Sequence, residues 1–567
     1  PSAPPPPPKP VIELEGTPRV RDNPEAEGTK GRWKRRAGSA AAEDEVPAPT
    51  ETPGSTEPRL LEIGESSGSE GQPDMEEGMT YQDMTVVPPT RLWRPDDHAE
   101  DMILPDRDKE QLIDAWSDGL SHRFHDDYRD WLQSGRMNSM YKVDGQVYFH
   151  PDLRIGQGGR AEVFLGVMAS DGREVAVKVI GQGEKVDASF NEERKSMKKH
   201  SVIPGAVQYI NSFIYGFKDH RGREKYEKVV VMELMEGTLA ESMVHWQTQV
   251  GKLPHLQVIR YISASLTHIL SRLNTGAHRD QVHREVSPET VMFDHAGGVR
   301  LAGIGAHRHQ GKPMEPGACF ASPEQRSGCL DSHRTSDLYS LGKVMLCMGL
   351  ANPNGAQLSL DMLDEMAWPS HQHHGAAFRD LLLALLAEDP QKRAYNDKLP
   401  PSTAPHRIVL AHPFFWSSRR CLDFLVTLGL YASPPFGDVL TNAVTDSIRE
   451  SGAGDSWYDR VRDLDGEPAS TSEAQQVPFN LLRFIRSKCS HINDAKMGLQ
   501  LRRKLLDEPI FLHRFPTLAL RCWLALLQVL AEIKKYDQHA QLREYFERPV
   551  ELESIQNSVD ERQSHWL

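Results

Sequence analysis

The sequence has few cysteines and no long apolar run. Only six cysteines occur in 567 residues, and no two of them are spaced as Cys-x-x-Cys. This argues against a disulfide framework or a zinc site and fits a reducing compartment. No apolar run approaches the roughly 20 residues that a membrane-spanning helix needs, and no signal peptide is recognised. These absences predict a cytoplasmic protein that holds no metal ion.

The sequence also lacks an excess of positive charge. The formal net charge is −14 at pH 7. Bulk attraction to nucleic acid is therefore excluded, and any contact with RNA must come from a local patch of basic residues. DNA is not an expected partner.

Composition divides the chain into five stretches. Residues 1–105, rich in Pro, Glu, Ser and Gly, are predicted to be disordered because they cannot bury enough apolar surface to offset chain entropy. Residues 106–146 carry bulky apolar residues every four positions, which predicts an amphipathic helical lead-in. Short β-rich runs followed by helical patterns predict an α+β domain over 147–414. Residues 415–547 are expected to be wholly helical, and residues 548–567 form a tail.

The first half of the α+β domain carries motifs that resemble those with which protein kinases bind ATP. IGQGGRAEVFLG resembles the Gly-rich loop, whose backbone N–H groups approach phosphates, and VAVK follows with the phosphate-pairing lysine. FNEERKSM supplies the glutamate partner of that lysine, with Glu192 as the register alternative to Glu193, and VVVMELMEGTL resembles the hinge beside the adenine. The expected contacts of a bound ATP or ADP are Gly156, Gly158, Val163, Ala176, Lys178, Glu193, Met232 (the gatekeeper), Glu233 and Met235.

The motifs that hold magnesium in protein kinases are degenerate in this chain. HREVSPETVMF stands in the place of HRDLxxxN, so Glu285 replaces the catalytic aspartate and Thr290 replaces the metal-binding asparagine. LAGIG occupies the DFG region, where Gly303 replaces the magnesium aspartate. Phosphoryl transfer consists mostly of positioning and charge neutralisation by metal. We therefore expect nucleotide to bind weakly and independently of Mg²⁺, and phosphoryl transfer to be lost.

The structural landmarks of the kinase fold persist. SPEQ and SDLYSLG resemble two motifs of the helical lobe, and Arg393 is the expected partner of Glu324. Between Gly303 and Ser322 the chain has no Ser, Thr or Tyr, so the activation segment offers no hydroxyl for phosphorylation. The fold is expected to survive where the chemistry does not.

The helical stretch that follows resembles the kinase-extension nuclease (KEN) family, which includes ribonuclease L and the inositol-requiring ER stress-sensor kinase/endoribonuclease. The resemblance rests on LLRFIRSKCSHI and on DEPIFLHRFP, and with the kinase-like part it covers about residues 147–547. It implies a dimer that cleaves RNA without metal and leaves a 2′,3′-cyclic phosphate. By position, His491 would be the general acid/base, Arg486 would clamp the phosphate, and Trp457 matches a tryptophan of the family's site.

Two site positions depart from the family pattern. Asn480 replaces an acid, Ser487 replaces an asparagine, and Trp457 and His491 stand closer in sequence than in the relatives. The alternative interpretation makes His491 and Arg486 ordinary residues of a solvated helix. The surrounding basic stretch is likewise either a solvated face or a track for phosphates; it comprises Arg483, Arg486, Lys488, Lys496, Arg502, Arg503 and Lys504.

The sequence therefore predicts a two-lobed protein-kinase-like fold followed by an all-α KEN ribonuclease-like domain. The expected function is a nucleotide-binding pseudokinase fused to an endoribonuclease, with RNA, nucleotide and a second copy as partners. A non-catalytic signalling scaffold is the alternative, and an active Ser/Thr protein kinase is the third choice. Because the chain begins with Pro1, a fragment of a membrane-anchored sensor would instead lie on the cytosolic face of the ER.

Overall fold

The computed structural model describes part of the chain. The described residues are 86–87, 141–143, 146–157, 161–168, 170, 172–183, 188–218, 221–250, 256–274, 282–304, 319–328, 335–355, 358–363, 372–399, 403–431, 438–451, 457–464, 477–490, 510–534, 539–548 and 555. Of residues 106–146, predicted to be a helical lead-in, only 141–143 and 146 are described, and of the region predicted to be disordered only 86–87 are described. Those two predictions therefore stay untested.

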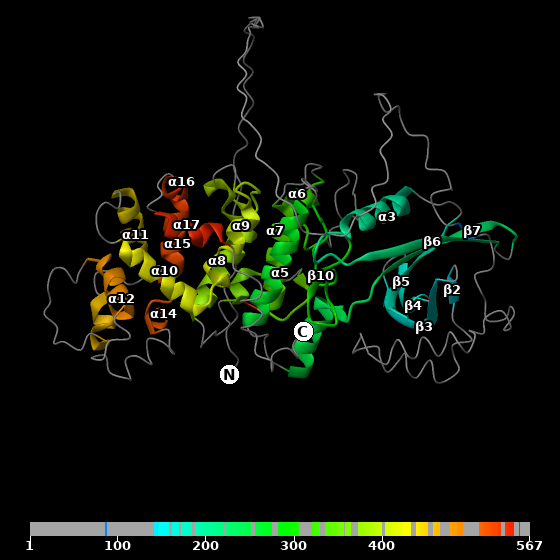
Figure 1. The fold of residues 1–567 in the computed structure, drawn as a ribbon, viewed down its shortest axis with the longest axis horizontal. Helices are drawn as coiled ribbons and strands as arrows, with labels where there is room; N and C mark the ends of the chain where they lie inside the picture. The colour runs from blue at the N-terminus through cyan, green and yellow to red at the C-terminus, as the bar shows by residue number, and fades with distance from the viewer. Residues whose placement is uncertain are drawn as a thin grey trace, which may run out of the picture. The chain divides into compact units, whose positions relative to one another are not determined.

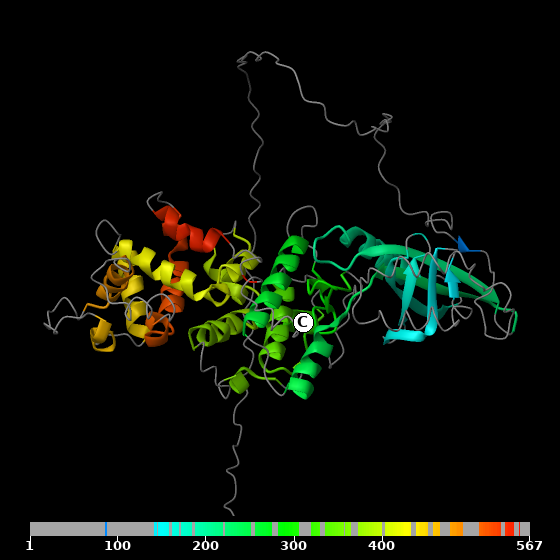
Figure 2. The ribbon, with the colours of Figure 1, turned by 60° about the horizontal axis from the view of Figure 1, so that its bottom comes forward.

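A seven-stranded sheet precedes the helical part of the kinase-like region (Figures 1 and 2). Its order is β1-β6-β7-β5-β4-β3-β2, and every pair is antiparallel except β1 with β6. The strands are β1 (Val86–Val87), β2 (Tyr141–Val143), β3 (Val147–Gln157), β4 (Ala161–Met168), β5 (Glu174–Gly183), β6 (Tyr209–Lys218) and β7 (Glu224–Glu233). The β-rich runs predicted from residue 147 onward are thereby confirmed, whereas β1 and β2 lie in the stretches predicted to be disordered and helical, respectively.

The two faces of this sheet follow from the alternation of residues along β5. Val175 and Val177 point into one apolar core, together with Phe149 and Phe164. Ala176 and Lys178 alternate with these valines and therefore occupy the opposite face. That face is covered in part by helix α3 (Ala188–His200), whose Phe190 is buried.

The second half of the kinase-like region is mostly helical, as expected. A small sheet of β8 (Gly237–Thr238), β9 (Val291–Phe293) and β10 (Val299–Leu301) adjoins it. The long helices α5 and α7 lie side by side (Figure 1). The helical elements are α4 (Leu239–His245), η4 (Trp246–Val250), α5 (Leu256–Asn274), α6 (Pro323–Arg326), α7 (Ser336–Gly349), η7 (Leu360–Leu363), α8 (Gln372–Leu385), η8 (Arg393–Lys398), α9 (Pro405–Leu410) and η9 (Pro413–Phe415).

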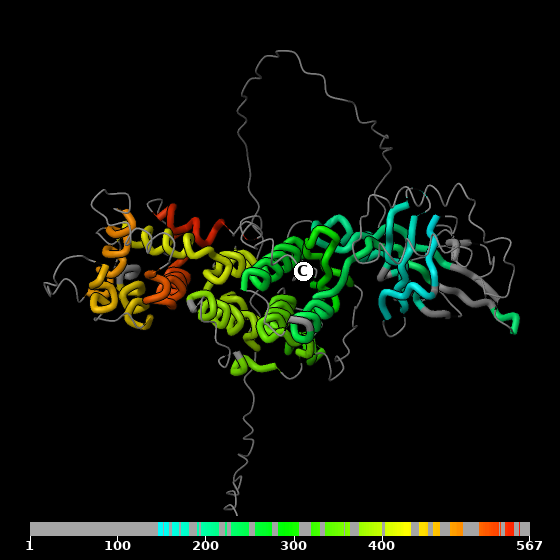
Figure 3. The backbone as a smooth tube through the Cα atoms, turned by 90° about the horizontal axis from the view of Figure 1, so that it is seen from below, coloured from blue at the N-terminus to red at the C-terminus, as the bar shows by residue number. Residues whose placement is uncertain are grey.

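The rest of the described chain contains helices and no strand, and its elements gather around α10 (yellow to red in Figure 3). They are α10 (Ser418–Leu430), α11 (Asp438–Glu450), η10 (Trp457–Arg460), η11 (Arg462–Leu464), α12 (Asn480–Ser490), α14 (Ile510–Arg514), α15 (Leu518–Gln528), α16 (Leu530–Ile533) and α17 (Ala540–Glu547). We call these elements the C-terminal helical block. Within the described ranges, no helix is both long and apolar enough to cross a membrane.

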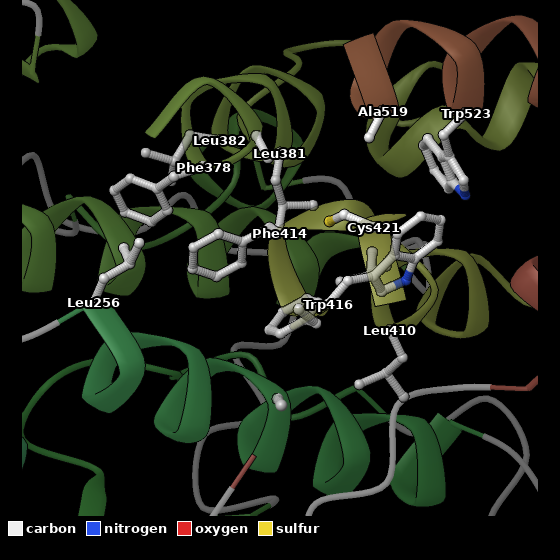
Figure 4. Close-up of a cluster of buried hydrophobic side chains, with 14 of the residues drawn as sticks. Leu256, Phe378, Leu381, Leu382, Leu410, Phe414, Trp416, Cys421, Ala519 and Trp523 are labelled. Carbon is white, nitrogen blue, oxygen red and sulfur yellow. The ribbon is translucent and has the colours of Figure 1, made fainter. Parts of the chain in front are cut away.

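One apolar core extends from the kinase-like helices into the C-terminal helical block. Figure 4 shows Leu256 of α5, Phe378 of α8 and Trp523 of α15 around Phe414 and Trp416. All belong to the same buried cluster, which also includes Ile555 from the predicted tail. The predicted boundary at residue 415 therefore falls inside a continuous core.

A buried polar network lies in the same junction. The His412 Nε2 atom lies 3.3 Å from the Asp380 carboxylate, and His412 Nδ1 accepts a hydrogen bond from the Phe414 N–H at 3.1 Å. Because Nδ1 accepts, Nε2 carries the proton and the imidazole is neutral. Burial lowers the pKa of His412, although Asp380 opposes this effect. The Tyr395 hydroxyl also donates to Asp380, and the Trp523 ring packs edge-on against His412.

Candidate functional sites

The strand register brings together the residues predicted to contact nucleotide. Gly156 of β3 pairs with Val163 of β4, and Val163 pairs with Lys178 of β5. Ala176, also on β5, lies opposite Met232 of the neighbouring strand β7. The Gly-rich segment, the lysine and the gatekeeper are thus held on adjacent strands, as the motif spacing requires.

Two of the predicted nucleotide contacts cannot be placed. Gly158 lies outside the described residues. Glu193 is part of α3, but its side chain is not described, and the same holds for the alternative Glu192. The ion pair expected between Lys178 and one of these glutamates therefore stays a prediction.

The side chain of Glu233 connects the hinge to the helical lobe. One carboxylate oxygen accepts a hydrogen bond from the Gln208 N–H at 3.2 Å, and the other lies 3.8 Å from the Arg300 guanidinium on β10. Arg300 is fixed in turn by a 3.0 Å hydrogen bond to Asp294. Met235, the next predicted contact, is buried. The hinge is thus fastened to β10 by a side chain.

A buried carboxyl beside the hinge was missed by the motif analysis. Glu174 is 7% exposed, and it shares a face of β5 with Ala176 and Lys178. Burial, assisted by the nearby Glu236 carboxylate, raises the pKa of Glu174 to about 7. The sequence does contain the signal: an acidic residue stands two positions before Ala176, on the strand face that carries the lysine.

The two positions predicted to have lost metal ligands lie next to each other. The Thr290 hydroxyl donates to the Glu285 carbonyl at 2.8 Å and accepts from the Ser287 N–H at 3.0 Å, so it braces its own loop. Gly303 has φ +78°, and a Cβ placed on it would lie 3.9 Å from Thr290 Cγ2. One position has thus lost its side chain, and the hydroxyl at the other is engaged. Nowhere in the described part of the chain do three or more His, Cys, Asp or Glu side chains gather in a way that could hold a metal ion.

The backbone of this loop keeps a strained conformation. Arg284 has φ +74°, which is uncommon for a residue other than glycine. The buried carboxylate of Asp337 accepts the backbone N–H groups of His283 at 2.6 Å and of Arg284 at 2.8 Å. Burial raises the pKa of Asp337 to about 6, although these two bonds favour the charged form. The loop is therefore held in place by the buried Asp337 carboxylate.

The ion pair expected between Glu324 and Arg393 is confirmed. The Arg393 guanidinium is buried and donates two hydrogen bonds to the carboxylate, at 2.6 and 3.0 Å. Burial alone would raise the pKa of Glu324, but hydrogen bonds from Arg393 and Ser336 outweigh it and lower the pKa to about 2. This pair joins α6 to η8.

A cavity of about 520 Å³ opens beside the degenerate loop. It is lined by Arg284, Glu285, Val286, Ser287, Glu289, Cys319, Phe320, Ala321, Pro353, Asn354 and Gly355. Three separate loops contribute these residues. A sequence motif covers only one of these loops. The motifs therefore identified Glu285 but not Cys319 or Asn354.

Helix α12 displays the predicted phosphate clamp. Leu481, Leu482 and Ile485 are buried, whereas Arg486 and Ser487 are exposed. Among the described residues, no acidic side chain lies within ion-pair distance of the Arg486 guanidinium. The helix ends at Ser490, and His491 and the basic residues after it lie outside the described ranges, so the predicted approach of Arg486 and His491 is untested.

The other two predicted site residues contact the beginning of α12. The Asn480 side chain accepts a hydrogen bond from Arg483 at 3.1 Å. Trp457 is 2% exposed, and its indole N–H donates to the Val477 carbonyl at 3.2 Å. Its ring lies 5.7 Å from the ring of Phe484. Trp457 is thus a buried residue that contacts both the turn leading into α12 and the second turn of the helix itself.

Comparisons with known proteins identify the first of these two regions. Residues 149–415 match the protein kinase domain family. The serine/threonine-protein kinase PknL of Mycobacterium bovis is 29% identical over 226 residues, which are 38% of this chain and 51% of PknL. Serine/threonine-protein kinase 36 of Mus musculus is 27% identical over 267 residues, 43% of this chain and 18% of that protein.

A further relative matches a longer part of the chain. The serine/threonine-protein kinase/endoribonuclease IRE2 of Homo sapiens is 24% identical over 431 residues, which cover 69% of this chain and 42% of the human protein. This alignment is longer than the kinase-domain match, whereas the specific resemblance to ribonuclease L stays a prediction. The chain thus spans about half the length of PknL and a smaller share of the other two relatives. Together with the two-lobed fold and the Glu324–Arg393 pair, the family match shows that residues 149–415 form a protein kinase-like domain.

Proposed function

We propose that the chain is a nucleotide-binding pseudokinase joined to a metal-independent endoribonuclease. The pseudokinase part rests on Thr290 and Gly303: these adjacent positions provide no metal ligand, because the Thr290 hydroxyl braces the Glu285–Ser287 turn and Gly303 has no side chain. The nuclease part rests on the exposed Arg486 of α12, five positions before His491. A relative whose name includes endoribonuclease, aligned well beyond the kinase domain, supports it.

The proposed reaction needs a cation and a proton carrier. The RNA 2′-hydroxyl attacks the neighbouring phosphorus and loses its proton, and the 5′-oxygen leaves with a proton, so a 2′,3′-cyclic phosphate remains. Arg486 would stabilise the charge that develops on the phosphate oxygens. His491 would transfer the proton. Neither step requires a metal ion, and the two residues would act in a dimer.

RNA cleavage is the direct test of this proposal. The purified chain should cut a stem-loop RNA equally well with and without EDTA and leave cyclic-phosphate ends. His491→Ala should lower the rate roughly 10²–10⁴-fold while RNA still binds. Arg486→Ala should cost a few kcal/mol of transition-state stabilisation. Replacing Lys496 or Arg503 should instead weaken binding and flatten its salt dependence.

Arg449→Ala is the matched control for Arg486→Ala. Arg449 is an exposed arginine of α11, but it is paired with Asp446 at 2.8 Å, so its loss should leave cleavage unchanged. Equal cleavage by the wild type and His491→Ala, or loss of cleavage in EDTA, would reject the endoribonuclease. A non-catalytic scaffold predicts nucleotide binding or dimerisation with no cleavage at all.

Nucleotide binding tests the pseudokinase half separately. ADP should bind the wild type with the same affinity in Mg²⁺ and in EDTA. The double substitution Thr290→Asn and Gly303→Asp supplies both missing ligands and should create a Mg²⁺ dependence, which calorimetry would measure. Labelled phosphate incorporated by the wild type and absent in Lys178→Ala would instead establish an active Ser/Thr protein kinase.

A further inference from the structure

The entry to α12 is fixed by the buried indole of Trp457. Its N–H donates to the Val477 carbonyl, three residues before the helix begins, and its ring packs against Phe484 in the second turn. Phe484 also meets Phe511 of α14 at 6.3 Å, edge to face. A single side chain therefore holds both the start of α12 and its inward face.

The short helix that carries Trp457 is itself fixed. The Arg514 guanidinium of α14 donates to the Asp463 carboxylate at 2.8 Å and to the Arg460 carbonyl, and Arg460 donates back to the Arg514 carbonyl at 3.3 Å. Charge-assisted and reciprocal hydrogen bonds of this kind restrict both partners. These bonds hold the segment that carries Trp457 against α14, so the position of the Trp457 ring relative to α12 is fixed.

On its opposite side α12 packs tightly against α10. A Cβ on Gly429 would lie 2.6 Å from the Leu482 carbonyl oxygen and 2.9 Å from the Cβ of Arg486. The helix is therefore held between Gly429 and Trp457, so a change at either contact moves Arg486. Interior packing does not absorb such changes freely.

We infer that Trp457 is a positioning residue of the nuclease site, which sets where α12 presents Arg486 and does not touch RNA. The inference rests on the proposed endoribonuclease activity. It differs from what the family resemblance implies, because that resemblance places the tryptophan among the site residues. A side chain that is 2% exposed cannot stack on a base, but it can displace a catalytic group when it is altered, and such displacements are costly.

The first test compares two Trp→Phe substitutions. Trp457→Phe keeps an aromatic ring but loses the bond to Val477. We expect kcat for RNA cleavage to fall about 10- to 100-fold with KM changed less than about 2-fold, because RNA binding is retained while the clamp is misplaced. Trp523→Phe is the control: it is also buried in the C-terminal helical block, but its indole N–H has no acceptor among the described residues, so kcat should change less than about 2-fold.

The second test does not depend on activity. The full chain would be labelled with 5-fluorotryptophan, and the Trp457 ¹⁹F signal would be assigned by its absence in Trp457→Phe. A soluble paramagnetic agent should leave this signal unbroadened both without RNA and with an RNA that carries 2′-deoxyribose at the cleavage site. Broadening in the absence of RNA that the RNA suppresses would show direct contact and overturn the inference.

The two proposals fail in different ways. Absence of cleavage by the wild type rejects the endoribonuclease, and the positioning role with it. Cleavage by the wild type with equal loss in Trp457→Phe and Trp523→Phe rejects only the positioning role. A raised KM at unchanged kcat in Trp457→Phe would also reject it, because that result indicates a binding residue.

Discussion

At the scale of single residues, the groups that shape the kinase-like lobe are separate from the groups that would perform phosphoryl transfer. Asp337 and Arg393 are buried and fully engaged with backbone N–H groups and with Glu324, respectively. Thr290 and Gly303, the positions predicted to have lost metal ligands, take no part in those contacts. The contacts that shape the lobe therefore do not depend on Thr290 or Gly303.

The Glu324–Arg393 pair predicts a pH dependence of stability. The pKa of Glu324 falls from 4.5 to about 2 on folding, so the pair contributes stability that is fully present above pH 4.5 and is lost as pH falls towards 2. A shift of this size corresponds to about 3 kcal/mol. We expect Glu324→Gln to lower the unfolding free energy by about this amount at pH 7 and by little at pH 2, as measured by urea denaturation.

The control for this prediction is an exposed ion pair. Arg419 and Asp423 lie 3.0 Å apart, but their side chains are 70% and 48% exposed, so Asp423→Asn should cost less than about 1 kcal/mol at either pH. If Glu324→Gln shows the same loss at pH 2 as at pH 7, the lowered pKa does not contribute to stability.

At the scale of elements, the contact between α10 and α12 depends on the absence of one side chain. The nearest atom to a Cβ on Gly429 is a backbone oxygen, which cannot swing away. Helix α12 in turn carries Arg486 on its exposed face. Packing inside the C-terminal helical block therefore decides the position of the proposed site.

Gly429→Ala should destabilise the protein and reduce RNA cleavage together. Overpacking of this kind typically costs about 1–3 kcal/mol, and the shift of α12 should lower kcat more than KM. Thermal unfolding and single-turnover cleavage would measure the two effects. Leu430→Ala is the control, at an exposed position on the same helix, and it should change stability by less than about 0.5 kcal/mol. An equal effect of both substitutions would show that any substitution in α10 is destabilising and that the contact with α12 has no special role.

The elements themselves were largely predictable from sequence, and the reasons are local. Valine-rich runs such as the one around Val175 and Val177 give strands because β-branched side chains suit a half-buried sheet. Glu324 and Arg393 stand at landmark positions of the kinase fold, so their ion pair could be predicted from the sequence. Trp457 could be matched to a site but not recognised as buried, because burial depends on Phe484, which is 27 residues away. The cavity beside Glu285 was unpredictable for the same reason: its walls come from three distant loops.

At the scale of the molecule, the shared core predicts that the kinase-like domain and the C-terminal helical block unfold together. Trp523 of α15 contacts His412, and the buried cluster extends from α5 to α17. Hydrogen exchange should therefore give equal opening free energies for the most protected amides of α5 and α15. ADP at 100 times its Kd should raise both by about 2.7 kcal/mol.

Trp523→Ala should lower the protection of both helices, since it opens a cavity in the shared core at a cost of about 3–5 kcal/mol. The contact with His412 adds a pH effect: the pKa of His412 is lowered by burial, so its neutral form contributes stability above pH 6.5 that is lost as pH falls. Two separate unfolding transitions, with ADP protecting only α5, would show that the halves are independent.

The run of buried side chains from Phe414 to Trp416 also limits how these two halves could be exchanged with other proteins. This segment belongs to the core of both halves, because α5, α8 and α15 all pack on it. A chimera that joins this C-terminal helical block to another kinase lobe would have to bring along matching partners for Trp523 and for the His412–Asp380 pair. Cutting the chain at residue 415 would expose an apolar face on each half. Neither half could therefore be transferred to another protein without new side chains to cover that face.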